Sequence, residues 1–287
     1  MQKVVWFIVA LFLTAPFPAT AEYKTIDELA KAYSVESCKS CHAKVHEEWQ
    51  TSYHSQSIVH SLGGMRNYIV VGLGQEWKKP VTRENLMRCM ECHAPLLKDA
   101  SESLAKQVGD LIIAAVDEKD ESKKAAAKKE LSKLNVNCII CHNTKISVEK
   151  NLRGSPAPDV YYGPTGKTTS AHKTEKSPAI TSAIFCGQCH GILGASDGDW
   201  IVCNTLYGSY QDGYRGNGGT ETCQDCHMKA KNRGHRFPGA YEAEIVKEGI
   251  GLDVQAAGVK LTPGKWIPTA VVNIGLRNQA GHRIPDG

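Results

Sequence analysis

The sequence has few aromatic residues and no long apolar run beyond its first twenty residues. Phe, Trp and Tyr make up only 7% of the 287 residues, which is little for a chain that must fill its own core. No later segment approaches the roughly 20 apolar residues that a membrane-spanning helix needs. The 34 basic residues are nearly balanced by 30 acidic ones, so the charge gives no support to nucleic-acid binding. We expect an interior filled partly by something other than side chains.

Residues 1–21 have the pattern of a cleavable signal peptide. One base, Lys3, precedes an apolar run from Val4 to Leu13, and the small residues Ala19 and Ala21 follow it. This run is too short to cross a bilayer. The pattern predicts cleavage before Glu22 and a mature protein without a transmembrane segment, located in the periplasm or outside the cell.

Ten of the eleven cysteines lie in five copies of the pattern Cys-x-x-Cys-His. The copies are Cys38 and Cys41 with His42, Cys89 and Cys92 with His93, Cys138 and Cys141 with His142, Cys186 and Cys189 with His190, and Cys223 and Cys226 with His227. This is the attachment pattern of c-type haem. The two intervening residues let one turn of backbone present both thiols to the haem vinyl groups, and the next residue reaches the iron as an imidazole ligand.

Other uses of paired cysteines explain this pattern less well. Zinc sites and redox dithiols give no reason for a histidine after every pair. Disulfides, the default for an exported protein, leave the five identical spacings unexplained. The sequence therefore predicts five covalently attached haem c groups, with the ten cysteines as attachment residues and the five motif histidines as iron ligands.

The sixth iron ligands decide between carrying electrons and binding a substrate. Six histidines remain outside the motifs: His46, His54, His60, His172, His235 and His282. The whole sequence has only five methionines, and methionine is the ligand that raises haem potentials. These numbers favour haems of low potential with histidine on both sides of the iron.

Several segments resemble multihaem cytochromes of the hydroxylamine oxidoreductase and pentahaem nitrite reductase superfamily. The similar segments are Cys38 to His42 with Trp49, Ser52 and His54; Tyr162-Gly163-Pro164 with His172 before Cys186; Cys223 to Met228 with Gly234-His235; and Asn278 to Pro285, which contains His282. The resemblance implies that His54, His172, His235 and His282 are distal iron ligands. It implies a fifth distal ligand that is His60 or His46, with His60 preferred. No motif replaces its histidine by the lysine that marks the catalytic haem of the pentahaem nitrite reductases.

The expected fold is mainly helical and irregular, organised by haem, with a small β segment at the carboxyl end. We expect a signal peptide at 1–21, a pentahaem cytochrome domain at 22–240 and a β segment at 241–287. Helices are predicted after the cap residue Ser101 and over residues 121–134. A long loop is predicted over 151–182, and strands over 244–261 and 266–276. The β segment looks unfinished, so a separate polypeptide or readthrough of the reading frame is expected to supply the missing strands, the alternative being a sheet that ends here with an exposed edge.

Two classes of function follow. The favoured one is an exported electron carrier of anaerobic respiration, with redox proteins in the membrane, the periplasm or outside the cell as partners. The alternative is a reductase or oxidase of a small nitrogen or sulfur species such as nitrite at one open haem. In that case His46, Tyr162, Lys173 or Arg66 is expected to polarise the substrate. Cys203, the one cysteine outside the motifs, is expected to be a buried thiol, with pairing to a second chain or sulfur chemistry as alternatives.

Overall fold

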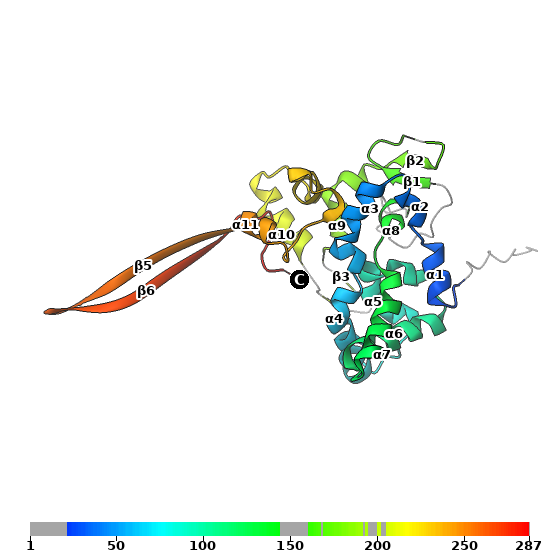
Figure 1. The fold of residues 1–287 in the computed structure, drawn as a ribbon, viewed down its shortest axis with the longest axis horizontal. Helices are drawn as coiled ribbons and strands as arrows, with labels where there is room; N and C mark the ends of the chain where they lie inside the picture. Colours follow the sequence, from blue (N-terminus) through cyan, green and yellow to red (C-terminus); the bar gives the residue numbers. More distant parts are fainter. Residues whose placement is uncertain are drawn as a thin grey trace, which may run out of the picture.

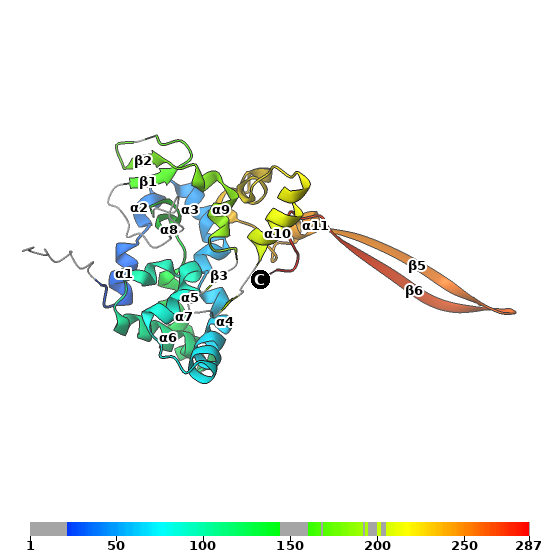
Figure 2. The same ribbon diagram turned by 180° about the vertical axis from the view of Figure 1, so that it is seen from behind.

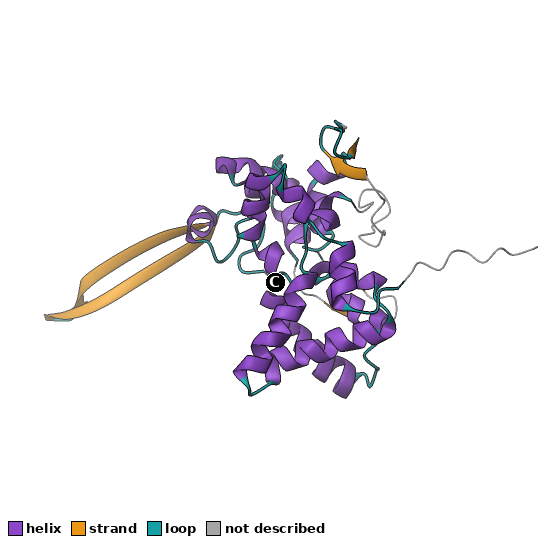
Figure 3. Ribbon diagram, turned by 45° about the vertical axis from the view of Figure 1, so that its right-hand side comes forward, coloured by secondary structure: helices purple, strands orange, loops and turns teal. Residues whose placement is uncertain are grey.

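The computed structural model describes residues 22–143, 160–167, 169–191, 193–194, 200–201 and 205–286. The predicted signal peptide and Cys203 lie outside these residues. The described chain is mainly helical, with irregular connections and short sheets (Figures 1 and 3), as predicted. The α-helices are α1 (Ile26–Ala32), α2 (Glu36–Lys39), α3 (Ala43–Gln50), α4 (Leu62–Asn67), α5 (Arg83–His93), α6 (Glu102–Asp117), α7 (Glu121–Leu131), α8 (Cys138–His142), α9 (Ala183–Gly187), α10 (Leu206–Gly213) and α11 (Ala243–Gly249). Wider π-helical turns cover Tyr68–Glu76 and Asp225–Lys229.

Helices α4 to α7 carry much of the hydrophobic core. Helix α6 begins after Ser101, whose side chain accepts a hydrogen bond from Leu104 N, and this N-cap satisfies a free backbone donor. Leu104, Val108 and Ile112 are fully buried, as their helical spacing predicts. Helix α7 ends at Leu131, and a short 3-10 turn continues to Leu134.

The strands form separate two-stranded pairs. They are β1 (Val160–Gly163) with β2 (Lys173–Lys176), parallel; β3 (Leu193–Gly194) with β4 (Trp200–Ile201), antiparallel; and β5 (Ile250–Thr262) with β6 (Lys265–Asn278), antiparallel. The prediction of a long loop over 151–182 was therefore wrong where β1 and β2 lie. The β-branched and aromatic residues at the start of β1 suit a strand, and Ser177 N donates to Gly163 O beside the pair.

The prediction of a strand from residue 244 was also wrong at its start. Residues 243–249 form helix α11, and strand β5 begins only at Ile250. Ion pairs hold the helix against the preceding segment: Lys231 contacts Glu244 and Glu248, and Arg233 contacts Glu248. Lys231 and Arg233 lie before residue 244, so the pattern of residues 244–261 that predicted a strand does not contain them.

Strands β5 and β6 form a long hairpin that projects away from the helical body (Figures 1 and 2). The turn between them contains Gly264 at φ 76°, a left-handed conformation that favours glycine. After β6 the chain returns to the body, where the Asp286 carboxylate accepts hydrogen bonds from the backbone N–H and the hydroxyl of Thr205. The β segment near the carboxyl end is thus present as predicted.

No helix within the described ranges is both long enough and apolar enough to span a bilayer.

Candidate functional site

Each of the five cysteine motifs lies on a tight turn or short helix. In the first motif His42 N donates to Cys38 O at 2.8 Å, and in the fourth His190 N donates to Cys186 O at 2.9 Å. The second motif forms the last turn of α5, and the third motif is α8 itself, capped by Asn137. One turn therefore brings both thiols of a motif and its histidine to the same side of the backbone, and all ten motif cysteines are free thiols.

Thiols of different motifs lie next to one another. Hydrogen bonding between Cys92 and Cys189 lowers the pKa of Cys92 and raises that of Cys189. Cys186 and Cys223 interact in the same way, which raises the pKa of Cys186 and lowers that of Cys223. The second motif therefore meets the fourth, and the fourth meets the fifth.

The first and third motifs also meet. Burial, together with the nearby thiol of Cys38, raises the pKa of Cys138 to about 11. Burial raises the pKa of Cys141 to about 12. The charge of Cys141 in turn acts on Cys186 and Cys189 of the fourth motif. The fourth motif therefore contacts the second and fifth motifs and lies within electrostatic range of the third.

Backbone carbonyls fix the orientation of three motif histidines. Nδ1 of His93 donates to Ser57 O at 2.9 Å, Nδ1 of His142 donates to Tyr162 O at 2.8 Å, and Nδ1 of His227 donates to Pro238 O at 2.8 Å. A carbonyl can only accept, so Nδ1 carries the proton and Nε2 keeps its lone pair. This is the arrangement in which an imidazole binds a metal through Nε2.

Four motif histidines face a histidine from elsewhere in the chain. The ring centres are 6.4 Å apart for His42 and His172, 6.1 Å for His190 and His54, 6.2 Å for His142 and His235, and 6.2 Å for His227 and His282. A metal–imidazole bond is about 2 Å long, so two imidazoles on opposite sides of one metal ion have ring centres roughly 6 Å apart. All four spacings match an iron held between two histidines.

The second motif is different. Among the residues that the structure describes, no other histidine ring stands beside His93 as in the four pairs. His60, the predicted fifth distal ligand, is exposed; its Nε2 lies 3.0 Å from Gln56 Oε1, and its ring packs on Tyr53 at 4.6 Å. His46, the alternative, is only 3% exposed, packs on Trp49, and its Nδ1 has no hydrogen-bond partner.

Of the four residues expected to polarise a substrate, two are held in surface ion pairs. Arg66 Nη2 lies 2.6 Å from Asp117 Oδ2, and Lys173 Nζ lies 2.8 Å from Glu175 Oε1. Tyr162 contributes its carbonyl to His142. These contacts give Arg66 and Lys173 structural partners of their own.

Burial keeps the clustered histidines in the form that binds metal. Desolvation, with smaller contributions from the neighbouring His190 and His235, lowers the pKa of His54 to about 4. Desolvation is also the largest cause of the lowered pKa values of His93, His142, His190, His227 and His235. Neutral imidazoles are required for ligation. Together with the thiols, the paired rings and the orphaned Nδ1 of His46, they fit covalently bound haem.

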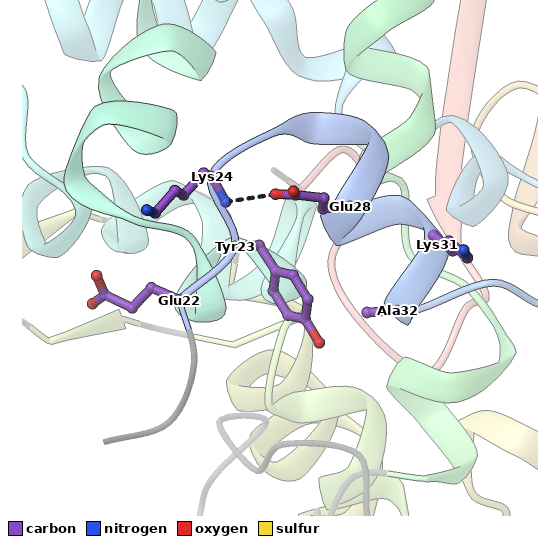
Figure 4. Close-up of a pocket in the computed structure, with 6 residues that line it drawn as sticks. All are labelled: Glu22, Tyr23, Lys24, Glu28, Lys31 and Ala32. Carbon is purple, nitrogen blue, oxygen red and sulfur yellow. Dashed lines mark hydrogen bonds between the residues drawn. The ribbon is translucent and has the colours of Figure 1, made fainter. Parts of the chain in front are cut away.

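A surface pocket at the amino end is separate from this cluster. It is lined by Glu22, Tyr23, Lys24, Glu28, Lys31 and Ala32, and Lys24 N donates to Glu28 Oε2 at 3.0 Å there (Figure 4). None of these residues belongs to a cysteine motif. The hydrogen bond belongs to the start of α1, where Thr25 and Glu28 cap the helix reciprocally.

The motif cluster and the four histidine pairs fit a multihaem c-type cytochrome. The sequence model of the family described as cytochrome c554 and c-prime matches residues 37–113, a segment that contains the first two motifs. This match supports covalently bound haem c and a role in electron transfer. No curated protein and no solved structure matches the chain.

Sequence patterns did not reveal the residues that hold the motifs together. Ser57 Oγ donates to His93 O at 2.7 Å and accepts from Val136 N at 2.9 Å. Trp49 Nε1 donates to Val136 O at 3.0 Å. The superfamily resemblance includes Trp49, whereas no sequence signal singles out Ser57.

Proposed function

We propose that the protein is an exported pentahaem cytochrome that relays electrons through closely packed haems. The observation that carries this proposal is the set of four histidine pairs with ring centres 6.1 to 6.4 Å apart, each pair containing one motif histidine. Each bound haem supplies an iron that accepts and releases one electron. Two cysteines of the chain would attach each haem, and in the four paired motifs the Nε2 atoms of two neutral histidines would hold the iron.

The distal ligands in this proposal are His172 for the first motif, His235 for the third, His54 for the fourth and His282 for the fifth. Histidine on both sides of the iron gives low potentials. Low potentials suit the passage of electrons to an acceptor of anaerobic respiration, with redox proteins as partners.

The contacts between thiols suggest the order of the motifs in space. The first motif meets the third through Cys38 and Cys138, and the fourth meets the fifth through Cys186 and Cys223. The charge of Cys141 links the third motif to the fourth. We propose a line of first, third, fourth and fifth motifs, with the second attached as a branch at the fourth through Cys92 and Cys189.

A second function is favoured by the position of His93 on this branch. Within the described ranges His93 lacks the facing histidine ring that the other motif histidines have, so the second haem is proposed to have one open position. An open iron can bind a small nitrogen or sulfur species such as nitrite. The line through the other four motifs then supplies or removes the electrons of its reduction or oxidation.

Electron paramagnetic resonance of the oxidised protein separates these functions. With His93 unpaired, one haem in five is high-spin and shifts its optical spectrum when cyanide or nitrite is added. The matched variant His60→Ala leaves this spectrum unchanged. If the wild-type protein is entirely low-spin and His60→Ala creates a high-spin haem, His60 is the sixth ligand and the protein is a carrier alone.

We propose that the mature protein works in the periplasm or outside the cell, as is typical of multihaem c-type cytochromes. The signal-peptide pattern before Glu22 supports this location. The measurement is the amino-terminal sequence of the protein purified from its host. An intact start at Met1 would refute the proposed cleavage.

The β5–β6 hairpin is proposed to be covered by strands of a second polypeptide chain. On one of its faces Leu252 pairs with Leu276, Val254 with Ile274 and Ala256 with Val272, and the Leu, Val and Ile residues of this face are 55 to 72% exposed. An isolated hairpin is only marginally stable in water. Native mass spectrometry is expected to find a complex, and a plain monomer would refute this assignment.

A further inference from the structure

Helix α3 carries two adjacent side chains that reach the two sides of one histidine pair. The pair is His142, from the third motif, and His235, which lies eight residues after the fifth motif. Neither residue belongs to α3. The helix itself follows the first motif directly, so it connects three motifs that are far apart in the sequence.

Trp49 fixes the side of the pair that belongs to the third motif. Its indole Nε1 donates to Val136 O at 3.0 Å, and Val136 lies two residues before Cys138. Val136 is buried, so its carbonyl has no easy access to water as a replacement partner. This hydrogen bond therefore anchors the segment that leads into α8 and His142.

Glu48 fixes the opposite side. Its Oε2 accepts a hydrogen bond from the backbone N–H of His235 at 3.0 Å. The Glu48 side chain is only 15% exposed, and Lys44 Nζ lies 3.9 Å from Oε1 with a side chain that is 85% exposed. Because Lys44 is so exposed, it neutralises the Glu48 carboxylate only weakly. Most of the negative charge of Glu48 therefore acts on neighbouring groups such as His235.

The residue before His235 is shaped to receive this carboxylate. Gly234 has φ 59°, and a Cβ placed there would lie 2.1 Å from Glu48 Oε2 and 2.6 Å from its Cδ. Only glycine allows both the left-handed backbone and this close approach. The carboxylate and the Gly234-His235 turn therefore fit each other closely.

We infer that Glu48 is a positioning residue that sets the ligation and the potential of the third haem. This inference rests on the proposed function, in which His235 is the distal ligand opposite His142. The hydrogen bond from His235 N–H to Glu48 holds the backbone of His235 in the position at which its ring centre lies 6.2 Å from that of His142. The negative charge beside His235 stabilises the ferric form of that haem and so lowers its potential.

Two substitutions of Glu48 separate its positioning role from its electrostatic role. Glu48→Gln keeps an oxygen that accepts the His235 N–H but removes the charge. It is expected to leave the haem low-spin while shifting the potential of one haem upward. Glu48→Ala removes the acceptor, so one additional high-spin haem and one additional equivalent of bound cyanide are expected.

Glu47 provides the matched control, because it is the neighbouring glutamate on the same helix and is exposed. Glu47→Gln and Glu47→Ala are expected to leave spin state and potentials unchanged. The readouts are electron paramagnetic resonance, a potentiometric titration followed optically, and the haem count by mass, which verifies that each variant is loaded.

His235→Ala distinguishes failure of this inference from failure of the proposed function. If His235→Ala adds no high-spin haem, the ligand assignment itself is wrong. If His235→Ala adds one but Glu48→Ala does not, Glu48 has no positioning role. If Glu48→Gln shifts no potential, or shifts one no more than Glu47→Gln does, the electrostatic role is refuted.

Discussion

Replacement of His282 tests the proposed ligand pairs at a partly exposed position. His282 is only partly buried and lies on the segment that returns from the hairpin, where its Nδ1 donates to Arg283 O. Its ring lies 6.2 Å from that of His227 with an angle of 18° between the planes. The two rings are nearly parallel, unlike the 68° between His54 and His190.

The size of the effect follows from counting the pairs. With four paired motif histidines and no ring facing His93 in the described part of the chain, we expect one haem in five to be high-spin, and His282→Ala to make this two in five. Parallel imidazole planes split the iron dπ orbitals more than perpendicular planes do. The lost low-spin signal should therefore be the most rhombic one, while the signal from the 68° pair remains.

The assay is quantitative electron paramagnetic resonance of the oxidised protein, with added imidazole as a rescue. Imidazole is expected to restore the low-spin signal in His282→Ala. His282→Met is expected to keep six ligands but to raise the potential of one haem, since methionine ligation raises potentials. A spectrum of His282→Ala identical to that of the wild type would refute the assignment of His282 to the fifth motif.

Three further predictions concern stability and the order of the motifs. Asp225 accepts hydrogen bonds from Thr222 and Lys229, and the Lys229 ammonium is the main cause that lowers the pKa of Asp225 to about 2. The ionised carboxylate therefore stabilises the folded protein. This contribution is complete above the pKa of an unfolded aspartate, near 4, and is lost as pH falls towards 2. Melting temperatures measured over a series of pH values should fall between pH 4 and 2 in the wild type and fall less in Asp225→Asn. An equal fall in both proteins would contradict this role of Asp225. Gly234→Ala should displace Glu48 and destabilise the protein by about 1 to 3 kcal/mol through backbone strain. The control Gly64→Ala lies in helix α4, where no atom stands within 4 Å of the added Cβ, and it should be neutral or stabilise the protein by up to about 1 kcal/mol. Similar melting temperatures for the two variants would count against the close fit of Glu48 at Gly234. Replacing both cysteines of the second motif by serine should leave electron transfer between the first and fifth motifs intact, whereas the same change in the fourth motif should interrupt it. The measurement is the rate of haem reduction after rapid mixing with a reductant. Equal slowing in both variants would rule out the second motif as a branch.

The sequence predicted what depends on local spacing. The cap at Ser101 and the helical spacing of Leu104, Val108 and Ile112 predicted helix α6, and the strands predicted over 244–261 and 266–276 left only a short connection where the hairpin turn lies. The five cysteine motifs predicted short turns that present two thiols and a histidine together. Each of these features is encoded within a few consecutive residues.

What the sequence could not give depends on contacts between distant residues. His54 and His190 are 136 positions apart, and their approach follows from packing that no local pattern encodes. The superfamily resemblance predicted His54, His172, His235 and His282 as distal ligands without assigning each to a motif. Helix α11 was missed for the same reason, since its ion pairs come from Lys231 and Arg233.

Mass spectrometry of the mature, purified protein measures how many haem groups the chain carries. We expect a polypeptide that starts at Glu22 and carries the mass of five haem groups. These groups remain attached under denaturing conditions because the thioether bonds are covalent. A bare polypeptide, or one that carries fewer than five haems when made with full haem supply, would contradict this expectation.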